Sequence, residues 1–151
     1  MQTERPQSRV VDYTPRPRDL AYTFGGRRPV LEVAPGTVMR IHTEDCFGGA
    51  VRGVGDLPSQ VCQLANLNPV SGPFFVTGAE PGDTLALHLV SITPVRDWGF
   101  SSTFPHFGAL TSTHTTPTLQ PPLAERVWRY TIDRDAGSVR YAASRSDFTV
   151  D

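Results

Sequence analysis

Hydrophobic and polar residues alternate with a period of two in several short stretches of the chain. In residues 37–43, the apolar Met39 and Ile41 alternate with Arg40 and His42. Such alternation is typical of half-buried strands, and the prolines and glycines between the stretches mark turns. The other predicted strands are residues 84–92, 126–132 and 138–144, with a hairpin loop at 133–137.

Residues 34–43 and 80–89 resemble each other: each has a Pro-Gly turn, an alternating stretch and a histidine. We interpret them as two similar strand entries, because Pro presets φ for the turn and Gly accepts a positive φ. The second places Leu85, Leu87 and Leu89 on one face, and we expect its His88 to be structural.

The pattern predicts an all-β fold, a β-sandwich of short antiparallel strands with at most one short helix. The helix candidate is residues 57–67, in which Ser59 is placed to act as the N-cap. Residues 1–28 are rich in Arg and Pro and predict an N-terminal arm or an edge strand. Residues 29–151 then form the β-sandwich domain. The end of the chain, RSDFTVD, stops within an alternating pattern, which predicts one part of a longer or split polypeptide.

The composition is that of a globular protein, with 38% hydrophobic and 19% charged residues among 151. A formal net charge of -1 gives no field that would recruit nucleic acid or an anionic membrane. All 14 basic residues are arginine, which excludes a lysine Schiff base within this chain. There is no signal-peptide core or membrane-length apolar run, and with two cysteines a reducing cytoplasm is the expected location.

Chemistry-bearing side chains gather in HTEDCFGG, residues 42–49. If the strand ends near Thr43, the glycines allow the chain to turn at a rim, where Asp45 would serve as a metal ligand or a base. His42 and Glu44 share one strand face. An ordinary turn cap is the alternative for Asp45.

Cys46 is a second candidate, as a nucleophile. A neighbouring carboxylate raises the pKa of a thiol, which works against thiolate formation. We therefore favour a small buried hydrophobe at Cys46, and a packing role for Cys62.

Two loops complete the candidate chemistry. Residues 66–83 contain Asn-Pro, Gly-Pro and Pro-Gly steps, and a rigid loop of this kind can present backbone N–H groups to a substrate oxygen. Residues 97–122 form a long predicted loop, which favours a lid or a partner-binding segment. It contains aromatic residues suited to an apolar pocket, and two histidines: Trp98, Phe100, Phe104, Phe107, His106 and His114.

Three blocks together resemble the N-terminal half of the acetamidase/formamidase family: PVLEVAPGTVMRIHTEDCFGG, NPVSGPFFVTGAEPGDTLALHLVSITP and WGFSS…FPHFGAL. The resemblance covers residues 29–110 and extends more loosely to 151. It implies a cytoplasmic enzyme that hydrolyses short aliphatic amides, such as formamide or acetamide, to the carboxylate and ammonia. Family members are longer than this chain, so the C-terminal half or a second subunit would complete the site. We also expect a homo-oligomer.

The resemblance further implies a divalent metal, zinc, that activates water. Carried over by position, Asp45 is the metal-binding or catalytic carboxylate. His42, or alternatively Glu44, is the further metal ligand that this chain offers. Asn68, Gly72 and His106 would form the substrate pocket, although His106 stands where the family pattern has a small residue. Zinc takes about three protein ligands plus water, so this chain would supply only part of the site.

Two other hypotheses stay open at this point. One is a non-catalytic β-sandwich that binds a partner or a carbohydrate through residues 97–122. The other is an amidase in which Cys46 is the nucleophile.

Overall fold

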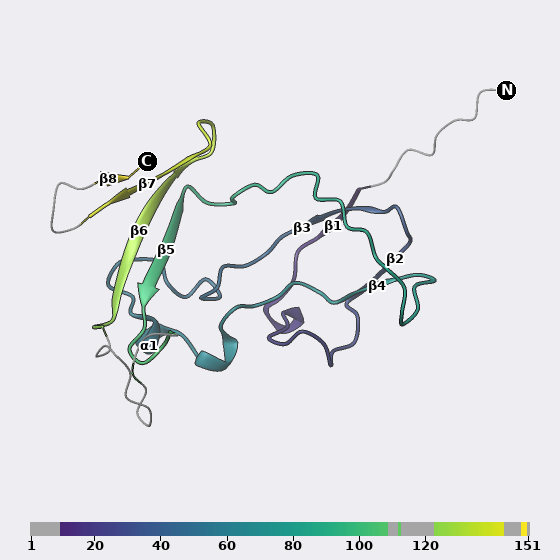
Figure 1. The fold of residues 1–151 in the computed structure, drawn as a ribbon, viewed down its shortest axis with the longest axis horizontal. Coiled ribbons are helices and arrows are strands. Elements are labelled where there is room, and N and C mark those ends of the chain that lie inside the picture. The colour runs from purple at the N-terminus through teal and green to yellow at the C-terminus, as the bar shows by residue number, and fades with distance from the viewer. Residues whose placement is uncertain (1–9, 109–111, 113–122, 144–148, 151) are drawn as a thin grey trace. The chain divides into compact units, whose positions relative to one another are not determined.

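The computed structural model describes residues 10–108, 112, 123–143 and 149–150. The chain divides into two compact units, one formed by residues 1–48 and 65–86 and the other by residues 49–64 and 87–151. Helical structure in the described residues is limited to one four-residue α-helix and two three-residue 3-10 turns. The elements are β1 (Val10–Tyr13), η1 (Pro17–Asp19), β2 (Leu31–Val33), β3 (Val38–Ile41), α1 (Pro58–Val61), η2 (Leu64–Asn66), β4 (Phe74–Val76), β5 (Trp98–Thr103), β6 (Arg126–Asp133), β7 (Ser138–Ala142) and β8 (Thr149–Val150) (Figure 1).

The first unit contains two parallel strand pairs. β1 pairs with β3, with Tyr13 opposite Ile41, and β2 pairs with β4, with Leu31 opposite Phe74. The all-β class and the strand predicted at 37–43 are confirmed, but the antiparallel prediction is wrong for these pairs. Parallel partners require a long crossover connection, and alternation within one strand carries no information about its partner.

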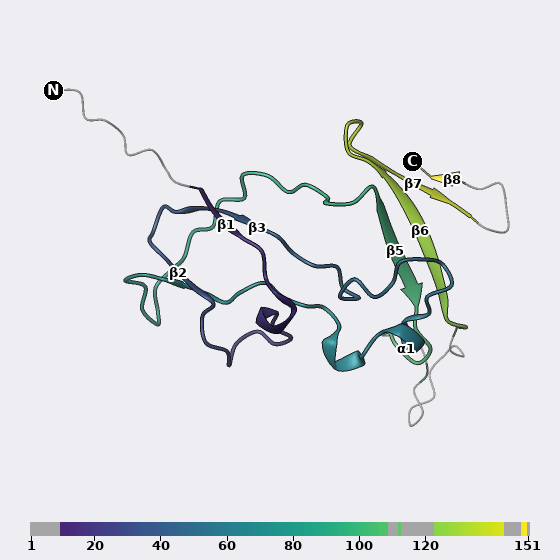
Figure 2. The same cartoon turned by 180° about the vertical axis from the view of Figure 1, so that it is seen from behind.

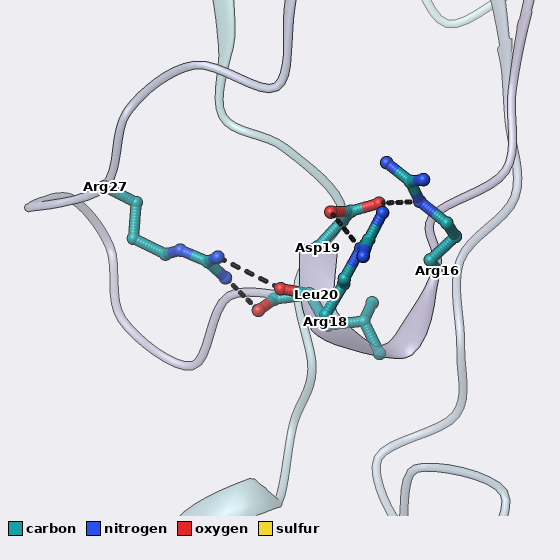
Figure 3. Close-up of polar contacts among 5 residues, drawn as sticks. All are labelled: Arg16, Arg18, Asp19, Leu20 and Arg27. Carbon is teal, nitrogen blue, oxygen red and sulfur yellow. Dashed lines mark hydrogen bonds and ion pairs between the residues drawn. The ribbon is translucent and has the colours of Figure 1, made fainter.

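The N-terminal arm is held by arginine contacts around η1 (Figure 3). Arg16 Nε lies 2.7 Å from the Asp19 carboxylate, and Arg27 donates to the backbone carbonyls of Arg18 and Leu20. The hydrogen bond from Arg16 holds the pKa of Asp19 below its usual value. Carbonyls at the end of a helical turn lack partners within it, so Arg27 stabilises the exit from η1. The segment predicted as an N-terminal arm therefore contains an ordered strand, β1, and the 3-10 turn η1.

The second unit contains an antiparallel sheet in the order β5-β6-β7-β8, and Figures 1 and 2 show its strands side by side. The predicted strands at 126–132 and 138–144 are confirmed as β6 and β7. The hairpin loop between them is also confirmed, with the Asp133 carboxylate accepting the N–H groups of Asp135 and Ala136. Cross-strand packing places the rings of Tyr130 and Tyr141 5.5 Å apart, an arrangement that stabilises strand pairs.

The predicted helix at 57–67 is shorter than expected, and Ser59 is not its N-cap. α1 begins at Pro58, whose missing N–H costs nothing at the first helical position. Leu57 stands at the N-cap without a side-chain cap. Glu125 takes over that role, because its carboxylate accepts the backbone N–H of Ser59 at 2.8 Å and the Ser59 hydroxyl at 2.5 Å. A distant carboxylate of this kind cannot be read from local sequence.

The predicted strand at 84–92 is wrong for this structure. Residues 84–94 have no regular secondary structure, and Leu87 is 86% exposed. The segment has the alternation of a strand, but the described residues provide no partner for it. The predicted loop at 97–122 is also corrected in part, because β5 occupies its first residues. His114 and the rest of that loop's end lie outside the described residues, as does most of 145–151.

Few hydrophobic side chains are buried in the described part of the chain: Ala21, Val51 and Val127. The sandwich arrangement and the boundary at residue 28 stay predictions. No helix in the described ranges has the length and apolar character needed to cross a bilayer.

Candidate functional site

The predicted carboxylate site lies directly after β3. The strand's pairing extends one residue past its end, because the His42 N–H donates to the Tyr13 carbonyl at 2.9 Å. The Glu44 carboxylate then accepts the backbone N–H of the next residue, Asp45, at 2.9 Å. His42, Glu44 and Asp45 are all half-buried. The sequence prediction that a strand runs out into a turn here is confirmed.

Asp45 organises the turn that follows. Its Oδ1 accepts the Phe47 N–H at 2.8 Å, and its carbonyl accepts the Gly48 N–H at 2.9 Å. This is an Asx turn, in which the side chain imitates a backbone acceptor.

Other aspartates also cap turns, by accepting backbone N–H groups of residues that precede them. Asp56 accepts the N–H groups of Arg52 and Gly53, and Asp83 accepts the N–H of Glu80. Turn capping alone therefore accounts for an aspartate at position 45. A chemical role for Asp45 is an addition to this structural role, and the two are separable by substitution.

The loop of residues 66–73 is hydrogen-bonded to this strand end. The Asn68 N–H donates to the Cys46 carbonyl at 2.8 Å, and the Ser71 hydroxyl donates to the His42 carbonyl at 2.8 Å. Four of the predicted site residues make these bonds or stand next to a residue that does, in the first unit: His42, Asp45, Asn68 and Gly72. This association links segments more than twenty residues apart in the sequence.

Asn68 and Gly72 have backbone conformations that explain their residue types. Asn68 has φ 54° and Gly72 has φ 117°, both in the left-handed region. Asn tolerates this region better than most residues, and Gly adopts it freely. A Cβ on the buried Gly72 would also meet the Phe74 ring at 3.4 Å. Both residues therefore have a structural reason to be present.

The arm anchors the other side of the same loop. Ala21 and Val70 exchange two backbone hydrogen bonds of 2.8–2.9 Å, and the Val30 N–H donates to the Pro73 carbonyl at 2.9 Å. The N–H groups of Asn68 and Val70 are thus engaged in internal bonds. This weakens the prediction that the loop's amides receive a substrate oxygen.

Cys46 differs from its predicted environment. It is exposed, whereas we expected a buried side chain. Partial desolvation of the thiol and, second, the charge of Asp45 raise its pKa. The predicted electrostatic effect of Asp45 is therefore present, and the thiol stays protonated at neutral pH. This counts against Cys46 as a nucleophile.

His106 belongs to the second unit. It lies in a turn after β5, where the Phe107 N–H donates to the Phe104 carbonyl, and it has φ 61°. Its Nδ1 is 2.9 Å from the Ser112 carbonyl oxygen. A left-handed φ favours glycine, which fits the expectation of a small residue at this position. The aromatic residues pair locally, Trp98 with Phe100 at 5.0 Å and Phe104 with Phe107 at 6.2 Å.

The donors of the described residues do not complete a metal site. No group of three or more His, Cys, Asp or Glu side chains in these ranges is arranged to hold a metal ion. A zinc site takes three or four protein ligands. Asp45 and His42 could therefore supply only some of the ligands of a metal site.

Comparison with known proteins identifies the family of this chain. The profile of the Acetamidase/Formamidase family matches residues 27–137, and the chain belongs to this family. It is 31% identical over 123 residues to a formamidase from Methylophilus methylotrophus, covering 75% of this chain and 29% of that protein. It is 35% identical over 110 residues to an acetamidase from Mycolicibacterium smegmatis, covering 62% of this chain and 27% of that protein.

Solved structures agree with this assignment. The crystal structure of an acetamidase from Yersinia enterocolitica superposes with a TM-score of 0.65 at 32% identity, covering 84% of this chain and 40% of that one. The resemblance recognised in the sequence is confirmed. The chain spans less than half the length of each of these relatives.

Sequence reasoning missed three residues that build the region. Ser71 lies within the NPVSGP block that carries the family resemblance, so its hydroxyl could have been identified as a hydrogen-bonding group from the sequence. Ala21 and Tyr13 act through their backbone groups, which every residue has, and no local pattern marks them.

Proposed function

We propose that this chain forms part of an amidase that hydrolyses short aliphatic amides such as formamide and acetamide to the carboxylate and ammonia. The observation that carries the proposal is the family match over residues 27–137, together with relatives called formamidase and acetamidase. Because the chain spans 29% of the first of these relatives, the remainder of the family fold must complete the active enzyme.

Asp45 is the proposed catalytic carboxylate. It is half-buried, stands at a strand end and is fixed by its bond to the Phe47 N–H, so its position is defined before substrate arrives. Preorganised groups of this kind lose little entropy when they react. Asn68 and Gly72 are the proposed substrate-pocket residues of the first unit, with Ser71 holding the loop against His42.

A divalent metal, zinc, belongs to the proposal, with Asp45 and His42 as donors from this chain and the others from the completed enzyme. A bound cation of this kind lowers the pKa of water to about 7 and polarises an amide carbonyl. The proposed metal has a readout independent of turnover, namely zinc content after dialysis, compared between the wild type and Asp45→Asn.

The test uses this chain co-expressed with the part of the Yersinia enterocolitica acetamidase that it does not match. Ammonia release from formamide and acetamide is measured with zinc present. We expect release from the combination and none from either part alone. If the combination assembles but releases no ammonia from either amide, the proposed activity is wrong, and the non-catalytic binding module becomes the better hypothesis.

Substitution of Asp45 separates its two roles. Asp45→Asn keeps an oxygen for the Phe47 N–H but removes the charge, so we expect loss of turnover of about 100-fold or more with the fold retained. Asp56→Asn is the matched control, because Asp56 is also half-buried and caps a turn. Cys46→Ala should keep full turnover. If Cys46→Ala abolishes turnover and Asp45→Asn does not, Cys46 is the nucleophile and Asp45 only a turn cap.

A further inference from the structure

Tyr13 carries a buried hydroxyl that bonds to nothing in the described part of the chain. Of the side-chain nitrogen and oxygen atoms in these ranges, it is the one that is buried and has no hydrogen-bond partner. Buried polar side-chain atoms are paired in the large majority of cases, and an unpaired one calls for an explanation. The ring alone does not supply it, because phenylalanine would make the same edge-on contact with Phe74. The hydroxyl therefore needs a reason of its own.

Tyr13 belongs to a closed circuit of contacts within the first unit. Its carbonyl accepts the His42 N–H at 2.9 Å, and the His42 carbonyl accepts the Ser71 hydroxyl at 2.8 Å. Gly72 follows Ser71, and a Cβ on Gly72 would lie 3.4 Å from the Phe74 ring. The centroid of the Phe74 ring lies 5.1 Å from that of Tyr13, which closes the circuit. Tyr13 is therefore fixed, through its backbone and its ring, to the segments that carry His42 and Gly72.

The side chains of this circuit suit a small neutral ligand. A phenolic hydroxyl donates one hydrogen bond and can accept another, and the Phe74 ring beside it is apolar and half-buried. Small-molecule sites combine apolar side chains with a small number of placed polar groups. Acetamide has the matching groups, namely a carbonyl oxygen that accepts a hydrogen bond and a methyl group that packs against a ring.

We propose that Tyr13 is a substrate-binding residue, whose hydroxyl donates a hydrogen bond to the carbonyl oxygen of a short aliphatic amide. The Phe74 ring packs against the alkyl group of that amide. The inference rests on the proposed function for the identity of the ligand, and it adds the group that recognises the ligand's oxygen. The hydroxyl is unpaired in the free chain because its partner is the substrate, and a functional group of this kind is kept at a cost in stability.

Saturation-transfer NMR on the chain itself tests the binding, with acetamide as the probe. The methyl protons of acetamide should receive saturation from the wild-type chain. The transfer should fall about tenfold or more in Tyr13→Phe, which keeps the ring but removes the donor. The control is Tyr22→Phe, which removes the same atom from a side chain that is 40% exposed and should leave the transfer unchanged. Equal transfer to Tyr13→Phe, or none to the wild type, overturns the proposal.

Kinetics of the completed enzyme test the same bond during turnover. This chain is co-expressed with the part of the Yersinia enterocolitica acetamidase that it does not match, and KM and kcat are measured for acetamide. Tyr13→Phe should raise KM about tenfold or more with a smaller change in kcat, because the bond is made to the substrate and kept in the transition state. Urea denaturation of the chain gives the readout for a structural role. Loss of stability together with loss of turnover in Tyr13→Phe overturns the assignment.

The outcomes for Tyr13 and for the proposed activity can be told apart. Acetamide binding that depends on Tyr13, without ammonia release from the completed enzyme, rejects the activity and keeps the binding residue. Ammonia release that Tyr13→Phe leaves unchanged keeps the activity and overturns the binding residue. A less stable Tyr13→Phe that binds acetamide as the wild type does identifies water or a group of the chain as the partner of the hydroxyl, which also overturns the proposal.

Discussion

Individual residues around the β3 exit combine structural and chemical properties. Asp45 caps its turn, Asn68 takes up a left-handed φ, and Cys46 stands next to a carboxylate that raises its pKa. Each residue type has a local physical reason to be present. A chemical role must therefore be shown by substitutions that preserve the local geometry.

Asn68 allows such a separation. Asn68→Gly keeps the left-handed backbone without strain, whereas Asn68→Ala places a Cβ there and should lower the free energy of unfolding by about 1 kcal/mol. Urea denaturation of both variants measures this. If Asn68 contacts the substrate, Asn68→Gly should lose turnover in the completed enzyme while keeping stability. Full turnover in Asn68→Gly would limit Asn68 to a backbone role.

Cys46 gives a pH prediction. Because its pKa is raised in the folded chain, the resulting contribution to stability is complete below the unfolded pKa and is lost as pH rises through the folded pKa. Iodoacetamide labelling of a Cys62→Ser variant, which leaves Cys46 as the reactive thiol, should titrate at higher pH when folded than when unfolded in urea. A lower folded titration point would instead favour an activated nucleophile.

At the scale of elements, the local hairpin was predictable, whereas strand partners, the strand β5 and the absence of a strand at 84–92 were not. Residues 126–132 and 138–144 form a hairpin whose pairing is local, and both were predicted correctly. β1 and β3 pair across residues 14–37, and β2 and β4 across 34–73, which no alternation pattern encodes. The hydrogen bonds between Ser59 and Glu125 were not predicted, because local sequence does not identify distant partners. For the same reason, residues 84–92 were predicted as a strand although the described residues contain no strand partner for them.

Tyr13 joins the two parallel pairs of the first unit. Its ring lies edge-on to Phe74 of β4 with centroids 5.1 Å apart, and its buried hydroxyl has no hydrogen-bond partner among the described residues. A buried unbonded hydroxyl costs about 1–3 kcal/mol, so Tyr13→Phe should keep the ring contact and raise the free energy of unfolding by about 1 kcal/mol. Urea denaturation tests this, with the exposed Tyr22→Phe as control, for which we expect a change within about 0.5 kcal/mol. A loss of stability in Tyr13→Phe would show that the hydroxyl has a partner in solution.

At the scale of the whole molecule, the sequence suggested more burial than the structure has. The hydrophobic content fits a globular domain, yet only Ala21, Val51 and Val127 are buried hydrophobic residues in the described ranges. The apolar residues were identified correctly, but the alternation pattern does not say which of them are buried. For the candidate site, the family blocks pointed to Asp45 and Asn68, and the structure then joined their two segments through backbone bonds.

This exposure leads to the last prediction. With so few hydrophobic side chains buried in the described ranges, the chain should bind a dye such as ANS and should unfold in urea with a small m-value, because little surface is newly exposed on unfolding. If the proposed completion of the enzyme holds, adding the unmatched part of the Yersinia enterocolitica acetamidase should reduce ANS fluorescence and raise the m-value, because exposed apolar side chains become covered. A chain that alone binds no ANS and unfolds with the m-value of a compact domain of 151 residues would contradict this account, because its leucines would then already be covered by the chain itself.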